Sequence, residues 1–144
     1  MRLNLWILVR CMEKLIMERE GPKEDINSHG DIRSNFASEL IVYLDSISNS
    51  RVINRLQEIY SHIFIDEVQD VAGYDLNIIE ILMKSDISVT CVGDNKQATF
   101  KTNNSIKNKK MTGTNIWMFF EKMVSEGIAE IKKNLVSRRF NGNM

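Results

Sequence analysis

Two adjacent carboxylates, Asp66 and Glu67, follow a short apolar run with no spacer between them. The run at residues 63–65 is rich in β-branched and aromatic side chains, which predicts a buried strand. Carboxylates at the carboxyl end of a parallel strand reach the crevice where α/β proteins bind ligands, and their oxygens suit Mg²⁺ with its phosphates. One carboxylate would hold the ion, and its neighbour would polarise the water that attacks a γ-phosphate. Asp-Glu pairs also begin loops or cap helices, so this stretch alone leaves both interpretations open.

A second strand end with a similar character lies further along the chain. Residues 87–92 predict another strand, which Gly93 and Asp94 end. Residues 74–84 place apolar side chains mostly at helical spacing, so the two strands and this helix form a βαβ unit with parallel strands. Both strand ends then lie on the same edge of one sheet. The residues expected at that edge are Asp66, Glu67, Asp94 and Gln97.

These two stretches carry a family resemblance. FIDEVQD at residues 64–70, followed by VGDNKQATF at 92–100, resembles motifs II and III of the UvrD/Rep-type superfamily 1 DNA helicases, which are ATP-driven translocases on single-stranded DNA. LVSRRFN at residues 135–141 resembles a degenerate motif IV, with Arg139 as the better match and Arg138 as the alternative register. The resemblance implies the α/β class, and within it a three-layer P-loop NTPase (RecA-like) fragment with a parallel sheet.

The resemblance also implies a role for each matching residue. Asp66 would coordinate Mg²⁺ with Glu67 beside it, and Glu67 would act as the base for the attacking water. Gln97, near Asp94 in the ATP site, would sense the γ-phosphate, and Arg139 would stabilise charge on the transferred phosphoryl group. The resemblance further implies that Gln69 and Asp70, together with Gln97, form a conformational switch that links the ATP site to neighbouring domains. The implied cofactors are Mg²⁺ and ATP.

The chain departs from the family pattern in one respect. It has seven glycines and none is followed by lysine, so it contains no GxxxxGK[ST] phosphate loop (the Walker A motif). We therefore expect residues 61–144 to form the C-terminal half of the first RecA-like ATPase lobe, after a helical segment at 1–60. Such a fragment is expected to be inactive alone and to need the missing helicase domains or a complementary subunit as partner.

Composition and apolar spacing limit the other possibilities. The net charge is zero, from nineteen basic and nineteen acidic residues, so any nucleic-acid contact must come from a local patch. The two cysteines lie far apart without a metal motif, which favours a reducing, cytoplasmic setting. Residues 1–20, 35–47 and 52–60 show helical apolar spacing. Residues 1–20 do not resemble a signal peptide, and no stretch has transmembrane length, so no membrane partner is expected.

The segment after Gln97 is rich in lysine and asparagine. It is expected either to contact single-stranded DNA or to be a solvated loop. The candidate contacts are Phe100, as a base-stacking residue, and Lys101, Lys107, Lys109 and Lys110. Asn115 should then cap a helix that stops at Gly127, and residues 128–131 predict a third strand.

Two classes of function remain. The favoured one is a fragment of an ATP-dependent DNA helicase or translocase, which couples Mg-ATP hydrolysis to movement on single-stranded DNA. The alternative is a non-enzymatic chain: a decayed or partner-dependent module, or a single-stranded-DNA-binding protein that uses the lysine-rich segment.

Overall fold

The computed structural model describes residues 34–94, 97, 102 and 106–133. The elements in these residues are α2 (Ser34–Ile47), α3 (Arg51–Ile59), β1 (His62–Ile65), η2 (Val68–Asp70), α4 (Tyr74–Met83), β2 (Ser88–Cys91), η4 (Lys109–Met111), η5 (Gly113–Asn115) and α5 (Ile116–Ser125). The four α-helices and two strands fall where apolar spacing predicts them. None of these described helices is both long and apolar enough to cross a membrane. The helix predicted at residues 1–20 lies outside the described residues.

The two strands form a parallel pair, as the βαβ pattern predicts. His62 pairs with Ser88 and Ile65 with Cys91, so the strands end level with each other. Alternate residues point to opposite faces of a strand, and the described part of the chain covers one face of this pair. Ile65 is 8% exposed on the covered face, whereas Phe64 is 63% exposed on the other. The predicted burial of residues 63–65 is therefore correct for Ile65 and wrong for Phe64, and the described residues place helices against one face of the sheet.

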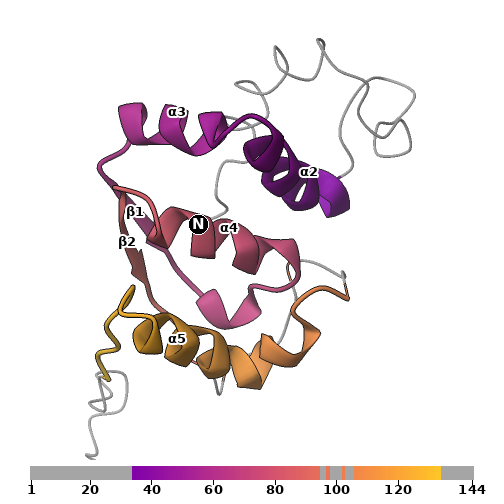
Figure 1. Ribbon diagram of the computed structural model, residues 1–144. Helices are drawn as coiled ribbons and strands as arrows, with labels where there is room; N and C mark the ends of the chain where they lie inside the picture. Colours follow the sequence, from indigo (N-terminus) through magenta and orange to yellow (C-terminus); the bar gives the residue numbers. More distant parts are fainter. Residues whose placement is uncertain (1–33, 95–96, 98–101, 103–105, 134–144) are drawn as a thin grey trace, which may run out of the picture.

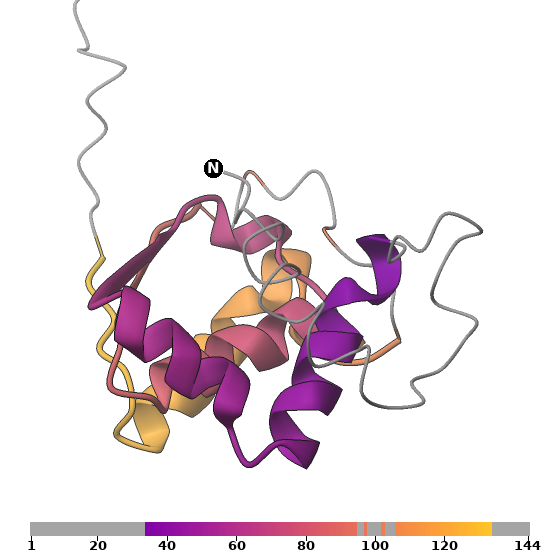
Figure 2. The same ribbon diagram turned by 90° about the horizontal axis from the view of Figure 1, so that it is seen from above.

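Helix α4 occupies the centre of the core and separates two apolar clusters (Figure 1). The first cluster joins Ile78 and Leu82 of α4 to buried residues of α2 and α3. The second joins Leu76 and Ile79 of α4 to α5 and to the segment after β1. Both clusters form on the side of the sheet where the helices lie, and the strands remain at one margin of the molecule (Figure 2). The helical segment and the βαβ unit therefore share the first of these two clusters.

An ionic cluster connects α4 to α5 on the surface. Glu80 accepts hydrogen bonds from the Nζ of Lys84 at 2.6 Å and from the Nζ of Lys122 at 3.2 Å. The hydrogen bond from Lys84 is the main cause that lowers the pKa of the Glu80 carboxyl. The cluster adds a charge contact between two helices that already share the second apolar cluster.

Helix α5 ends in a Schellman motif. The N–H of Ile128 donates to Met123 O at 2.9 Å, the N–H of Gly127 donates to Val124 O at 2.9 Å, and Gly127 has φ 72°. Gly127 thus stops the helix as predicted, whereas the Asn115 side chain makes no capping hydrogen bond.

The third strand predicted at residues 128–131 is absent from the described part of the chain. Ile128, Ala129 and Ile131 instead pack against the second apolar cluster. Their side chains are partly buried by this packing, so their apolar character reflects burial against this cluster without pairing in the sheet.

Candidate functional site

The two strand ends stay joined beyond the last strand residues. Val92 N–H donates to Ile65 O at 2.8 Å, and Val68 N–H donates back to Val92 O at 3.0 Å. These bonds hold the segment that follows β1 beside the segment that follows β2. The sheet edge at which the site residues are predicted is therefore formed by two segments that are hydrogen-bonded to each other.

Gln69 links the polar side chains at this edge. It is 2% exposed, its Nε2 donates to Glu67 Oε2 at 2.5 Å, and its Oε1 accepts the N–H of Asp94 at 3.0 Å. Gln97 Nε2 in turn donates to Asp94 Oδ2 at 2.9 Å. We call Glu67, Gln69, Asp94 and Gln97 the strand-end network. Three of these four are predicted site residues, and the structure connects them through a buried amide.

The carboxylates of Asp66 and Glu67 are both exposed, so a ligand can reach them. The backbone N–H of Glu67 donates to Oδ1 of the neighbouring Asp66 at 2.9 Å. Glu67 has φ 54° and ψ 41°, the left-handed conformation, which costs a residue with a side chain about 1–2 kcal/mol. Strained residues of this kind are concentrated at functional sites.

Gly93 is required by the close approach of the two loops. A Cβ at this position would lie 2.4 Å from Gln69 Oε1 and 2.9 Å from Val68 Cγ1. A side chain there would displace the amide that connects Glu67 to Asp94. The glycine of the second motif is thus explained by packing against the first.

The donor set fits Mg²⁺ bound together with a nucleotide. Within the described residues no group of three or more His, Cys, Asp or Glu side chains could hold a metal. Mg²⁺ is usually bound through one or two carboxylates and completes its octahedron with water and substrate phosphates. Asp66 and Glu67 supply two exposed carboxylates of this kind.

The other predicted site residues lie outside this network. Phe100, Lys101 and Arg139 are outside the described residues. Lys107, Lys109 and Lys110 belong to a turn against the start of α4, which the strand-end network does not include.

The spacing of residues in the sequence did not predict one polar cluster around Asp75. Asp75, in the first turn of α4, accepts hydrogen bonds from Ser38 Oγ of α2 and from Thr102 Oγ1. Thr102 also accepts the N–H of Ala72 at 3.1 Å and donates its own N–H to Asp70 O at 2.9 Å. Thr102 is therefore docked on the turn that follows Asp66 and Glu67. A threonine in a polar stretch gives no periodic signal, so spacing alone could not identify this contact.

The parallel βαβ unit thus places two exposed carboxylates at one strand end and joins them, through a buried amide, to the next strand end, the edge at which open α/β sheets bind ligands. The family model of the UvrD/REP helicase N-terminal domain matches residues 23–109. This match spans more than half of the chain, and the chain belongs to that family. Searches of curated proteins and of solved structures found no significant match.

Proposed function

We propose that this chain is part of an ATP-dependent DNA helicase motor and carries the half of the ATP site that holds Mg²⁺ and activates water. Asp66 would coordinate the ion, and Glu67 would orient and deprotonate the attacking water. Gln97, together with Asp94, would contact the γ-phosphate, and Arg139 would stabilise charge on the transferred group. Movement on single-stranded DNA would be the output of the complete motor, with the remaining helicase domains or a complementary subunit as partner.

The observation that carries the proposal is the strand-end network. It connects Glu67, the proposed base, to Gln97, the proposed sensor, through one buried amide. A hydrogen-bond network that fixes these side chains suits phosphoryl transfer, because that reaction is catalysed by positioning and electrostatics. Occupation of the γ-phosphate position would then alter the hydrogen bonds that orient the carboxylate of Glu67.

Two experiments test this proposal. The isolated 144-residue chain, titrated with MgATP, is expected to bind weakly, because its sequence contains no phosphate loop. Nanomolar stoichiometric binding would contradict that expectation.

The second experiment uses a longer chain, with an upstream segment that supplies a phosphate loop, and measures ATP hydrolysis in the presence of single-stranded DNA. Glu67→Gln is expected to lower kcat by about 100-fold or more while nucleotide binding is retained. Unchanged hydrolysis in that variant would refute the assignment of Glu67. The matched control is Glu58→Gln, an exposed glutamate in α3 outside the network.

A further inference from the structure

The face of the β1–β2 pair that points away from the helices carries exposed apolar side chains. We call it the outer sheet face, and its residues are His62, Phe64, Ser88, Thr90 and Val92. Phe64 is 63% exposed, and Val92, which directly follows β2, is 57% exposed. None of the five side chains is a carboxylate, an ammonium or a guanidinium group. This face can therefore be covered without burying an unpaired charge.

Two contacts hold the aromatic part of this face in place. The rings of His62 and Phe64 are stacked, with centroids 4.2 Å apart and an interplanar angle of 9°. His62 Nε2 also forms a hydrogen bond of 2.9 Å with Oγ1 of Thr90 on the neighbouring strand. The outer sheet face is thus preorganised across both strands, which lowers the entropy lost when another element packs on it.

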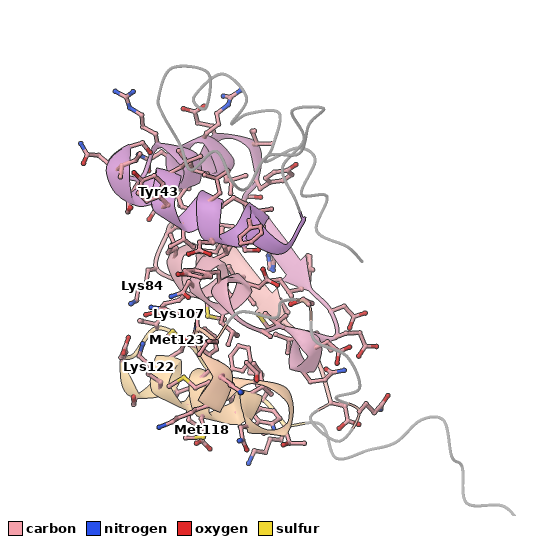
Figure 3. The ribbon with its side chains drawn as sticks, turned by 90° about the vertical axis from the view of Figure 1, so that its right-hand side faces the viewer. Tyr43, Lys84, Lys107, Met118, Lys122 and Met123 are labelled. Carbon is pink, nitrogen blue, oxygen red and sulfur yellow. The ribbon has the colours of Figure 1, made fainter. Side chains whose placement is uncertain are left out.

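The outer sheet face differs from the other exposed apolar residues because its members adjoin one another. Tyr43 on α2 and Met118 on α5 are also about half exposed, but they lie at opposite ends of the view in Figure 3. Phe64 and Val92 instead lie on neighbouring hydrogen-bonded segments. Parallel strands are generally covered on both faces, because their crossover connections place helices there. The described part of the chain supplies that cover on one face only.

Residues 1–20 have the sequence of a helix that would fit this face. They lie outside the described residues. At helical spacing, six apolar residues fall within an arc of about 120°: Leu5, Leu8, Val9, Met12, Leu15 and Ile16. Arg10, Lys14 and Glu18 fall on the opposite side. In proteins most of the stability of such a helix comes from packing of its apolar side, so residues 1–20 require a partner surface.

Residues 21–33 are long enough to bring the two surfaces together. An extended chain spans at most about 3.3 Å per residue, which gives this linker a reach of about 43 Å. A compact chain of about 90 residues has a radius of gyration of about 12 Å. The linker therefore extends further than the folded part is wide. Tethering also gives residues 1–20 a roughly millimolar effective concentration at the sheet, which favours them over a second copy of the chain.

We propose that residues 1–20 form an amphipathic helix that docks on the outer sheet face and covers Phe64 and Val92. The docked helix supplies the second helical layer of the βαβ unit, so that helices enclose the sheet on both sides. Its apolar side contacts the sheet, and Lys14 faces the solvent. The inference goes beyond the proposed function, because the docking requires neither ATP nor DNA.

The first test is disulfide formation within the full chain under mild oxidation. A Cys11→Ser, Cys91→Ala background removes the native thiols. Met12→Cys lies at the centre of the apolar arc. It is combined in turn with three substitutions that span the outer sheet face: Ser88→Cys, Thr90→Cys and Val92→Cys.

The matched control pairs carry Lys14→Cys in place of Met12→Cys. A disulfide requires two Cα atoms within about 7 Å of each other, so only packed surfaces are linked efficiently. We expect an intramolecular disulfide in at least one Met12 pair, and none of the Lys14 pairs should form one in the same time.

The second test is hydrogen exchange of the full chain without cysteine substitutions, followed by mass spectrometry. Peptides from residues 1–20 should exchange at least about 10-fold more slowly than an isolated peptide of the same sequence. Phe64→Asp places a charge on the outer sheet face and should remove this protection. Val92→Asp should do the same without altering the stacked rings of His62 and Phe64. Met118→Asp, also at an exposed position, should leave the protection unchanged.

The exchange of α4 in each variant reports whether the core is intact. Three results would overturn the docking: exchange of residues 1–20 at the rate of the isolated peptide, protection that persists in both Phe64→Asp and Val92→Asp, and equal disulfide yields in the Met12 and Lys14 pairs. Disulfides between chains instead of within one chain would assign the outer sheet face to a second copy and would also overturn the proposal. None of these measurements uses ATP, so their outcome is independent of the proposed function.

Discussion

Replacing Gly93 by alanine should destabilise the fold by forcing apart the two loops at the strand ends. The added Cβ would lie 2.4 Å from Gln69 Oε1 and 2.9 Å from Val68 Cγ1, both far inside van der Waals contact. Gln69 and Val68 are buried, so neither side chain has free space beside it. The amide of Gln69 would have to move and would release the N–H of Asp94.

The expected magnitude follows from two contributions. Overpacking of a buried site typically costs about 1–3 kcal/mol. A buried polar group that loses its hydrogen-bond partner costs about 1–3 kcal/mol more if it stays buried. Part of the clash is relieved by movement of the Gln69 side chain, so we expect a loss of about 2 kcal/mol in the free energy of unfolding, or roughly 6 °C in Tm for a chain of this size.

Urea denaturation followed by circular dichroism would measure this loss, with Gly127→Ala as control. Gly127 has φ +72°, and no atom lies within 4 Å of the place that a Cβ would occupy, so alanine there should cost about 1 kcal/mol from backbone strain alone. Combining Gly93→Ala with Gln69→Ala should cost less than the sum of the single changes, by about 1 kcal/mol, because one clashing atom is removed. Additive effects in this double variant would refute the packing argument.

Three further predictions concern the core and its surface. Burial raises the pKa of the Cys91 thiol from 9.0 to about 11, so in a Cys11→Ser background it should react with iodoacetamide roughly 100-fold more slowly than an unperturbed thiol at pH 8; equal rates would contradict its burial. The pKa of the Glu80 carboxyl is lower in the folded state than its unfolded value of 4.5. The ionised carboxylate therefore stabilises the fold above pH 4.5, and this stabilisation is lost as the pH falls through the lower folded pKa. Glu80→Gln should therefore reduce the pH dependence of Tm in that acidic range, and an unchanged pH dependence would contradict the contribution of this carboxylate. Asp75→Ala removes the acceptor of two hydroxyl groups and should lower the free energy of unfolding by about 2 kcal/mol in a urea titration; a change under about 0.5 kcal/mol would show that water replaces the carboxylate.

The sequence alone predicted the elements whose signal is local. Apolar residues at helical spacing located α2, α3, α4 and α5, and short β-branched runs located both strands. The helix between the strands required them to be parallel, because a parallel pair needs a crossover. The same logic placed Glu67, Asp94 and Gln97 at one edge, where the structure connects them. Their catalytic roles remain predictions.

Other features depended on partners that are distant in the sequence. Residues 128–131 have the composition of a strand, but their apolar side chains pack against the second apolar cluster, since local composition does not specify which surface buries an apolar side chain. Phe64 has the character of a core residue but is 63% exposed, because burial of a strand depends on what covers each face. Ser38 and Thr102 meet on the carboxylate of Asp75 from opposite directions along the chain. A hydroxyl group has no periodicity and finds its partner only when the chain is folded, so the tertiary structure decided these contacts.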